Sequence, residues 1–223
     1  ASAEIMVRNG GHNPQAEPGS AETYLCLGPG FSSAANTPHR RHKTWVHEGG
    51  ISTPLIAHWP KGISAKNELR QSPAHVIDIV PTVLEVSGVR APSVVDGIPQ
   101  SPIEGTSLAY TFDKANADEP SHHRTQYFEM TGKVGLYHDG WFLSGDDGRM
   151  AWEDLPPGGT RPEIRWSLYD LDKDFSQSTD LSAKEPARLR AMLGGTMASI
   201  KARREAAPMT DSMCASSAAS ACA

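Results

Sequence analysis

The residues best suited to chemistry lie in one short stretch, from Arg40 to Gly50. Four potential cations, Arg40, Arg41, His42 and Lys43, stand there shortly before a pair of glycines. A lysine in a partly enclosed cleft offers a compact positive charge to an oxyanion, and glycines let backbone approach a bound group closely. Two interpretations follow: an anion-binding loop centred on Lys43, or a solvated basic stretch that ends in a turn. The spacing alone favours the second.

The histidines of this stretch raise the question of a metal site. His42 and His47 flank Lys43, and His39 precedes them. The spacing of His42 and His47 does not bring two imidazoles to one helical face, and no carboxylate completes a ligand set. We therefore predict no metal site in this chain, and we take His42 and His47 as candidates for lining a cleft beside a bound anion.

Two features in the second half of the chain carry weaker signals. Trp152, in the loop 146–162, is the tryptophan best placed to line an aryl or carbohydrate pocket. The acidic run that starts at Asp170 superficially resembles a calcium loop, but Phe175 and Leu181 stand where an EF-hand needs Gly and Glu. We predict a solvated acidic turn at that point.

The elements that would position Lys43 begin directly after the glycines. Residues 51–59 form an apolar run rich in branched side chains, which is typical of a buried parallel strand. Residues 74–77 are expected to form a second short strand. Asp78 can then cap a helix through Val86, which Gly88 would end in the left-handed conformation. Strands and helix in this order favour an α/β layer.

The pattern changes after a polar, proline-rich linker at about residues 90–120. Short aromatic-rich segments then predict an antiparallel sheet with strands at 126–130, 134–137, 141–144 and 166–171. The sequence His138-Asp139-Gly140 supplies a hairpin turn between two of them. A helix is predicted from about residue 184 to residue 204.

Three stretches, in order along the chain, match motifs of one enzyme family. Lys43 to Ile56 reads Lys-x-x-x-x-Glu-Gly-Gly-Ile-x-x-Pro-Leu-Ile, and Asp78 to Gly88 contains Asp-x-x-Pro-Thr-x-Leu. Trp166 to Leu181 is similar to a closing strand and loop, although Phe175 stands where a proline is common. On these motifs the chain resembles the C-terminal portion of a formylglycine-dependent type I sulfatase, arylsulfatase-like, of the alkaline-phosphatase-like superfamily.

The resemblance implies a fold and a role for Lys43. Residues 1–110 would form the C-terminal part of an alkaline-phosphatase-like α/β mixed sheet domain. Residues 111–206 would form a small antiparallel-sheet and helix subdomain, and residues 207–223 a disordered tail. Lys43 would contact the sulfate group of the substrate, either a small sulfate ester or a sulfated glycan. A periplasmic or secreted location is expected by resemblance alone.

The resemblance also implies cofactors that this sequence does not hold. In the family a hydrated formylglycine, made within Cys/Ser-x-Pro-x-Arg, attacks sulfur while calcium and lysines stabilise the sulfate oxygens. The sequence contains neither that motif nor the Asp-Asn-Gly calcium ligands. We therefore expect formylglycine and calcium in the full-length enzyme, and a fragment inactive by itself. The alternatives are a truncated noncatalytic anion-binding or assembly module, and a phosphoesterase of the same superfamily.

Composition limits the other partners. The chain has 21 Lys and Arg against 26 Asp and Glu, a formal charge of -5, which gives no reason to expect nucleic acid or an anionic membrane as partner. It has no apolar run of about 18 residues, so no membrane span is predicted. The three cysteines lie far apart and support neither a disulfide framework nor a zinc site. We also expect the chain by itself to expose apolar side chains.

Overall fold

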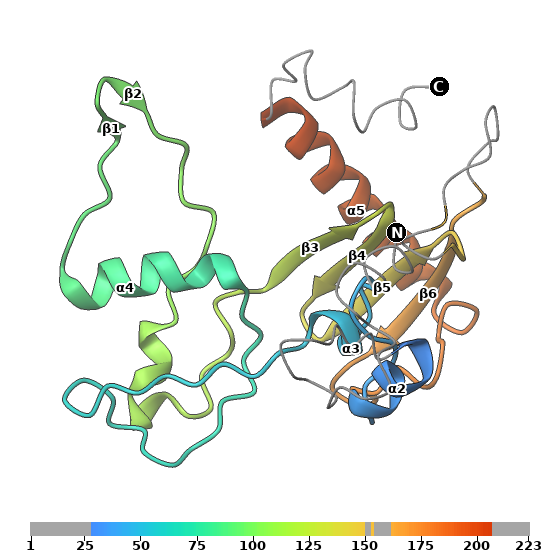
Figure 1. Cartoon of the computed structure of the whole chain (residues 1–223), viewed down its shortest axis with the longest axis horizontal. Coiled ribbons are helices and arrows are strands. Elements are labelled where there is room, and N and C mark those ends of the chain that lie inside the picture. The colour runs from blue at the N-terminus through green and yellow to red at the C-terminus, as the bar shows by residue number, and fades with distance from the viewer. Residues whose placement is uncertain (1–27, 150–152, 154–161, 207–223) are drawn as a thin grey trace, which may run out of the picture. The chain divides into compact units, whose positions relative to one another are not determined.

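The computed structural model describes residues 28–149, 153 and 162–206 (Figure 1). The chain divides into two compact units. The sheet unit comprises residues 1–52, 127–136 and 140–223, and the α4 unit comprises residues 53–126 and 137–139. Among the described residues, no helix is long and apolar enough to cross a membrane.

The sheet unit contains a four-stranded sheet in the order β3-β4-β5-β6. Its strands are Thr125–Met130, Lys133–His138, Trp141–Asp146 and Arg165–Asp170. The turns Thr131-Gly132 and Asp139-Gly140 have positive φ at both positions (52° and 84°, 45° and 80°), which suits tight hairpins with the natural strand twist. The four strands and the turn predicted from the sequence are confirmed.

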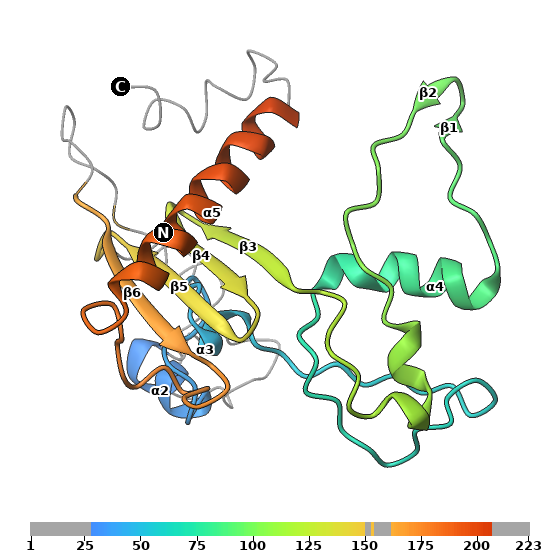
Figure 2. The same ribbon diagram turned by 180° about the vertical axis from the view of Figure 1, so that it is seen from behind.

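One face of this sheet packs against the helix α5 (Pro186–Ala206), as Figure 2 shows. The contact is a cluster of side chains that are at most 4% exposed: Leu136, Leu143, Leu168 and Met192. Gly195 lets the helix approach closely, because a Cβ there would lie 3.2 Å from a methyl group of Leu136. The predicted C-terminal helix is confirmed, and Pro186 occupies its first turn, where its missing N–H costs nothing.

The opposite face of the sheet packs against residues 45–47. Phe142 on β5 faces Tyr169 on β6 across the ladder, and both side chains are buried. Val46 lies so near β4 that a Cβ added to Gly135 would be 3.3 Å from it. Two short helices accompany this stretch, α2 (Gly28–Ala35) and α3 (Glu48–Ile51). The sheet is therefore covered on both faces.

The α4 unit contains the predicted central helix. A 3-10 turn, η1 (Val76–Asp78), leads into α4 (Ile79–Ser87), which ends at Gly88 with φ 67°, as predicted. The unit also has a short hairpin of β1 (Val94–Val95) and β2 (Ile98–Pro99). The turns η2 (Ala109–Phe112) and η3 (Lys114–Asn116) complete it.

Two predicted strands are wrong. Residues 52–59 have no regular structure, and Leu55 and Ile56 are 59% and 88% exposed. An apolar run becomes a buried strand only when a neighbouring strand satisfies its backbone, and neither sheet of the described residues includes this run. At residues 74–77 the chain instead enters η1. The expectation of exposed apolar side chains is confirmed, since Val80 and Val83 on α4 are also more than half exposed.

A buried polar network centred on Asp78 holds the start of α4. The carboxyl oxygens of this fully buried residue accept hydrogen bonds from the backbone N–H groups of His75 (2.8 Å) and Thr106 (2.7 Å). The Nδ1 atom of buried His123 lies 3.0 Å from Oδ1 and 2.8 Å from Oδ2 of the same carboxyl group. Asp78 thus ties three separate segments together, and it closes η1 instead of capping α4 with its side chain.

Thr82, the threonine of the Asp-x-x-Pro-Thr motif, forms two hydrogen bonds at the start of α4. Its Oγ1 donates to the carbonyl oxygen of Asp78 (2.6 Å) and accepts from the backbone N–H of Leu108 (2.8 Å). A Cβ on Gly105 would lie 2.1 Å from the carbonyl oxygen of Ile77, so the segment can approach the helix only with glycine there. The motif therefore fixes the start of α4.

The two compact units divide the chain near residues 52 and 126, because residues 45–47 pack against the sheet of the second half. The domain boundary expected between residues 110 and 111 stays a prediction. The predicted tail, residues 207–223, lies outside the described residues.

Replacing Asp78 by alanine should destabilise the protein strongly. Buried His123 and the partly buried backbone N–H groups of His75 and Thr106 would lose their partner, and breaking a buried polar pair typically costs about 3–5 kcal/mol. Urea unfolding monitored by circular dichroism measures the loss. The matched control is Asp118→Ala, which removes an exposed carboxylate and should change the free energy of unfolding by less than about 0.5 kcal/mol. Equal effects of the two variants would contradict the structural role of Asp78.

Candidate functional site

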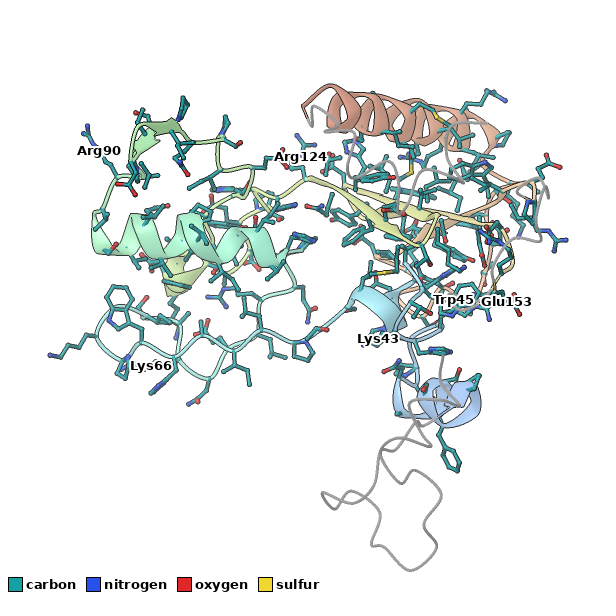
Figure 3. The ribbon with its side chains drawn as sticks, turned by 45° about the horizontal axis from the view of Figure 1, so that its top comes forward. Lys43, Trp45, Lys66, Arg90, Arg124 and Glu153 are labelled. Atoms are coloured by element: carbon teal, nitrogen blue, oxygen red, sulfur yellow. The ribbon has the colours of Figure 1, made fainter. Side chains whose placement is uncertain are left out.

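Lys43 lies on a loop of residues 40–50 that is exposed at its start and buried in its middle. Arg40, Arg41 and Lys43 are exposed, whereas Trp45 and His47 are 4% and 5% exposed. Figure 3 shows Lys43 and Trp45 beside α3, on the side of the sheet away from α5. We call residues 40–50 the Lys43 loop. Its buried middle anchors it while Lys43 faces solvent.

The glycine pair closes this loop. The backbone N–H of Gly49 donates to the carbonyl oxygen of Arg40 (2.9 Å). A Cβ on Gly49 would lie 2.2 Å from the carbonyl oxygen of Arg41, and one on Gly50 would lie 2.0 Å from that of Trp45. No side chain fits at either position. The glycines thus allow the loop backbone to pack closely against itself. The sequence had suggested only a close approach of backbone to a bound ligand.

The backbone on either side of Lys43 is unusual. Arg41 has φ 69° and Thr44 has φ 83°, in the region that favours glycine. For a β-branched residue such as Thr44 this conformation is costly, so surrounding contacts must hold it. His42, half-buried between them, has its Nδ1 3.1 Å from the carbonyl oxygen of Lys43.

Trp45 provides one of those contacts, because cations lie against its ring. The Arg41 guanidinium carbon is 4.2 Å from the ring centroid, and the Lys133 Nζ is 4.7 Å from it. Such cation–π contacts are stronger when the cation is removed from water. Lys133, on β4, is only 1% exposed. The basic stretch is therefore connected to the sheet through the ring of Trp45.

Lys133 was missed by the sequence reasoning. Its Nζ lies 3.7 Å from carboxylate oxygens of both Asp146 and Asp147, and it donates to the carbonyl oxygen of Arg149. A buried ammonium requires such partners. The available signal was a lysine in a strand of apolar residues, with two aspartates at the end of the neighbouring strand.

His47 lies under the loop, between two aromatic rings. Its ring centroid is 6.3 Å from that of Trp45 and 6.0 Å from that of Tyr169. Burial, together with the charges of Arg40 and Arg41, lowers the pKa of His47 from 6.5 to about 4, so its imidazole is neutral at pH 7. The structure favours a role in holding the loop, and substrate contact by His47 stays a prediction.

The other sequence-predicted site residues fall as follows. His42 adjoins Lys43 on the loop, whereas Trp152 lies outside the described residues. In the described part of the chain, no three His, Cys, Asp or Glu side chains converge to hold a metal ion. The acidic turn after β6 uses its carboxylates internally: Asp170 pairs with Lys173 (2.7 Å), and Asp174 accepts from the backbone N–H of Thr179 (2.8 Å).

Comparison with known proteins bears on this arrangement. Residues 39–130 match the family model described as N-sulphoglucosamine sulphohydrolase, C-terminal. An uncharacterized sulfatase of Schizosaccharomyces pombe is 26% identical over 78% of this chain and 29% of its own length. An arylsulfatase of Klebsiella aerogenes is 28% identical over 51% of this chain and 23% of its own length. The chain thus spans less than a third of these relatives.

A solved structure agrees with the fold. A protein of the glycosaminoglycan-metabolism locus of Bacteroides thetaiotaomicron superposes with a TM-score of 0.54 and 19% identity, covering 74% of this chain and 32% of that one. The fold is accordingly of the α/β, alkaline-phosphatase-like class. With the family model and the two sulfatases, the chain is similar to the C-terminal portion of sulfatases.

The burial of neutral His47 predicts a pH dependence of stability. Because its pKa is lower in the folded state, its contribution is complete above its ordinary pKa of 6.5 and is lost as pH falls toward about 4. We expect the wild type to lose about 2 kcal/mol more stability than His47→Gln between pH 7 and pH 4.5. Urea unfolding at both values measures this difference.

Glu48 acts in the opposite direction but is common to both proteins. Burial raises the pKa of its carboxyl group, so Glu48 favours the folded state more at low pH. Arg40→Gln, which removes one cation near His47, should shrink the pH effect without abolishing it. Identical pH profiles for the wild type and His47→Gln would show that His47 is not buried in neutral form.

Proposed function

We propose that this chain is the part of a sulfate-monoester hydrolase that places Lys43 against the sulfate group of the substrate. The observation that carries the proposal is the Lys43 loop, which holds an exposed lysine on a backbone that the Gly49–Arg40 hydrogen bond closes. Among the salt bridges of the described residues, none involves Lys43, so its charge is available to a ligand. The similarity to sulfatases supports sulfate ester hydrolysis as the reaction.

The positive charges of the Lys43 loop can stabilise the cleavage of a sulfate ester. As the ester bond to sulfur breaks, negative charge develops on oxygen, and a preorganised ammonium group stabilises that charge more in the transition state than in the ground state. Arg40 and Arg41, exposed on the same loop, add positive potential that attracts an anionic substrate. The Lys43 loop therefore contributes electrostatic stabilisation and substrate attraction.

The nucleophile and the metal are proposed to lie outside this chain. The sequence holds no Cys/Ser-x-Pro-x-Arg motif for formylglycine, and the described residues contain no group of ligands that fits calcium. No step through either group is therefore assigned to these residues. On this proposal the complete enzyme supplies both, and the chain alone does not turn over substrate.

We further propose a sulfated carbohydrate as the substrate class. The matching family model is described by an N-sulphoglucosamine sulphohydrolase, which supports a sulfated sugar over a simple aryl ester. A periplasmic or secreted location agrees with such a substrate. A noncatalytic anion-binding module and a phosphoesterase remain the competing outcomes of the experiment that follows.

Replacing Lys43 by alanine in the complete enzyme should lower kcat/KM for a sulfate ester by about 10²–10³-fold, the usual cost of removing one transition-state charge contact. Lys43→Arg should retain part of the activity. Steady-state kinetics with a sulfated monosaccharide and with the matching phosphate ester measure both effects. The matched control is Lys66→Ala, another exposed lysine, which should leave kcat/KM unchanged.

The outcomes separate the candidate functions. A large loss for the sulfate ester alone supports a sulfatase with Lys43 at the sulfate. A phosphate ester turned over faster than the sulfate ester would identify a phosphoesterase. A complete enzyme that binds the ester but does not cleave it would support the noncatalytic module, and an unchanged Lys43→Ala variant would contradict the role of Lys43.

A further inference from the structure

We propose that Gln177 is a positioning residue that holds the Lys43 loop from both sides. The inference rests on the proposed function, since it assigns Gln177 the task of fixing the lysine that meets the sulfate. Gln177 belongs to the turn after β6, 129 residues from Glu48 and 137 residues from Arg40 in sequence. It lies within the stretch Trp166 to Leu181, but the sequence assigned it no role.

Gln177 contacts the loop before and after Lys43. Its side-chain Oε1 accepts a hydrogen bond from the backbone N–H of Glu48 (2.8 Å). Its main-chain carbonyl oxygen accepts from the guanidinium group of Arg40 (3.4 Å). Because the loop also closes on itself between Gly49 and Arg40, Gln177 fixes the base from which Lys43 projects.

Gln177 is itself held rigidly. Its backbone N–H donates to the carbonyl oxygen of Asp174 (3.0 Å), and the Asp174 carboxylate accepts from Ser176 Oγ (2.7 Å) and the Thr179 N–H (2.8 Å). The turn follows β6, whose Tyr169 lies in the core beside His47. The sheet thus sets the position of Gln177, and the hydrogen bonds of Gln177 in turn set the position of the Lys43 loop.

Gln177 adopts an energetically unfavourable conformation. It is fully buried, it has φ 55°, and its Nε2 has no hydrogen-bond partner among the described residues. A buried unpaired donor and a left-handed non-glycine residue are both costly. Proteins typically keep such unfavourable local features where function requires them. Here the unfavourable conformation allows Oε1 of Gln177 to accept the hydrogen bond from Glu48.

A functional consequence follows from the exposure of Lys43. The lysine side chain is exposed, so the loop backbone beneath it sets the region that the ammonium group can reach. A displacement of about 1 Å at a charge contact can cost up to about 10²-fold in rate. Loss of the Gln177 contact should therefore weaken catalysis through Lys43 before it affects the rest of the fold.

The test compares two substitutions of nearly equal size. Gln177→Met removes the acceptor and keeps the side-chain length, whereas Gln177→Glu keeps an oxygen that can accept from Glu48. In this chain, hydrogen exchange of residues 40–50 should be about tenfold faster in Gln177→Met and near wild type in Gln177→Glu. In the complete enzyme, Gln177→Met should lower kcat/KM for a sulfated monosaccharide about tenfold, and Gln177→Glu should restore it.

A double-mutant cycle with Lys43→Ala distinguishes positioning from general damage. If Gln177 acts through Lys43, Gln177→Met has no further effect on kcat/KM once Lys43 is gone. An equal loss in both backgrounds would overturn the inference, as would unchanged kinetics with a lowered melting temperature. Gln177→Asn, which keeps a buried amide but withdraws its carbonyl, carries the same expectation if Gln177→Met fails to fold.

Failure of the proposed function gives a different pattern. In that case Lys43→Ala alone leaves kcat/KM unchanged, and the inference falls with it. If Lys43→Ala is impaired but Gln177→Met retains full activity and unchanged hydrogen exchange, the proposed function stands and the assignment of Gln177 is overturned.

Discussion

The packing of residues 45–47 against the sheet is the contact on which the position of Lys43 depends. Trp45 and His47 are buried with Phe142 and Tyr169, on the sheet face opposite α5. Burying large aromatic side chains contributes about 2 kcal/mol or more each, enough to hold a loop whose own backbone is strained. The buried residues 45–47 therefore anchor the loop on which the exposed cations lie.

Other features of the loop follow from that constraint. The loop needs Gly49 and Gly50, because its two backbone segments approach each other so closely that no side chain fits between them. Lys133 supplies a charge beneath Trp45, and Gln177 secures the base of the loop from the closing turn of the sheet. The arrangement joins distant segments at the point where the proposed chemistry needs a fixed lysine.

Local elements could be predicted from the sequence, but their long-range partners could not. The strands and hairpin turns follow from alternating aromatic residues and from Asp139-Gly140, which act over a few positions. The run at residues 51–59 was misassigned because a buried strand depends on a neighbour that composition does not reveal. Lys133 and Gln177 were missed for the same reason, since their contacts join residues nearly ninety or more positions apart.

A crystal structure of the complete enzyme with inorganic sulfate bound would show directly whether Lys43 contacts the sulfate group. We expect the Lys43 Nζ to lie about 3 Å from a sulfate oxygen, the distance of a charge-assisted hydrogen bond, with Gln177 still accepting from the Glu48 N–H. Sulfate held by other residues, with Lys43 directed into solvent, would show that Lys43 is not the sulfate contact.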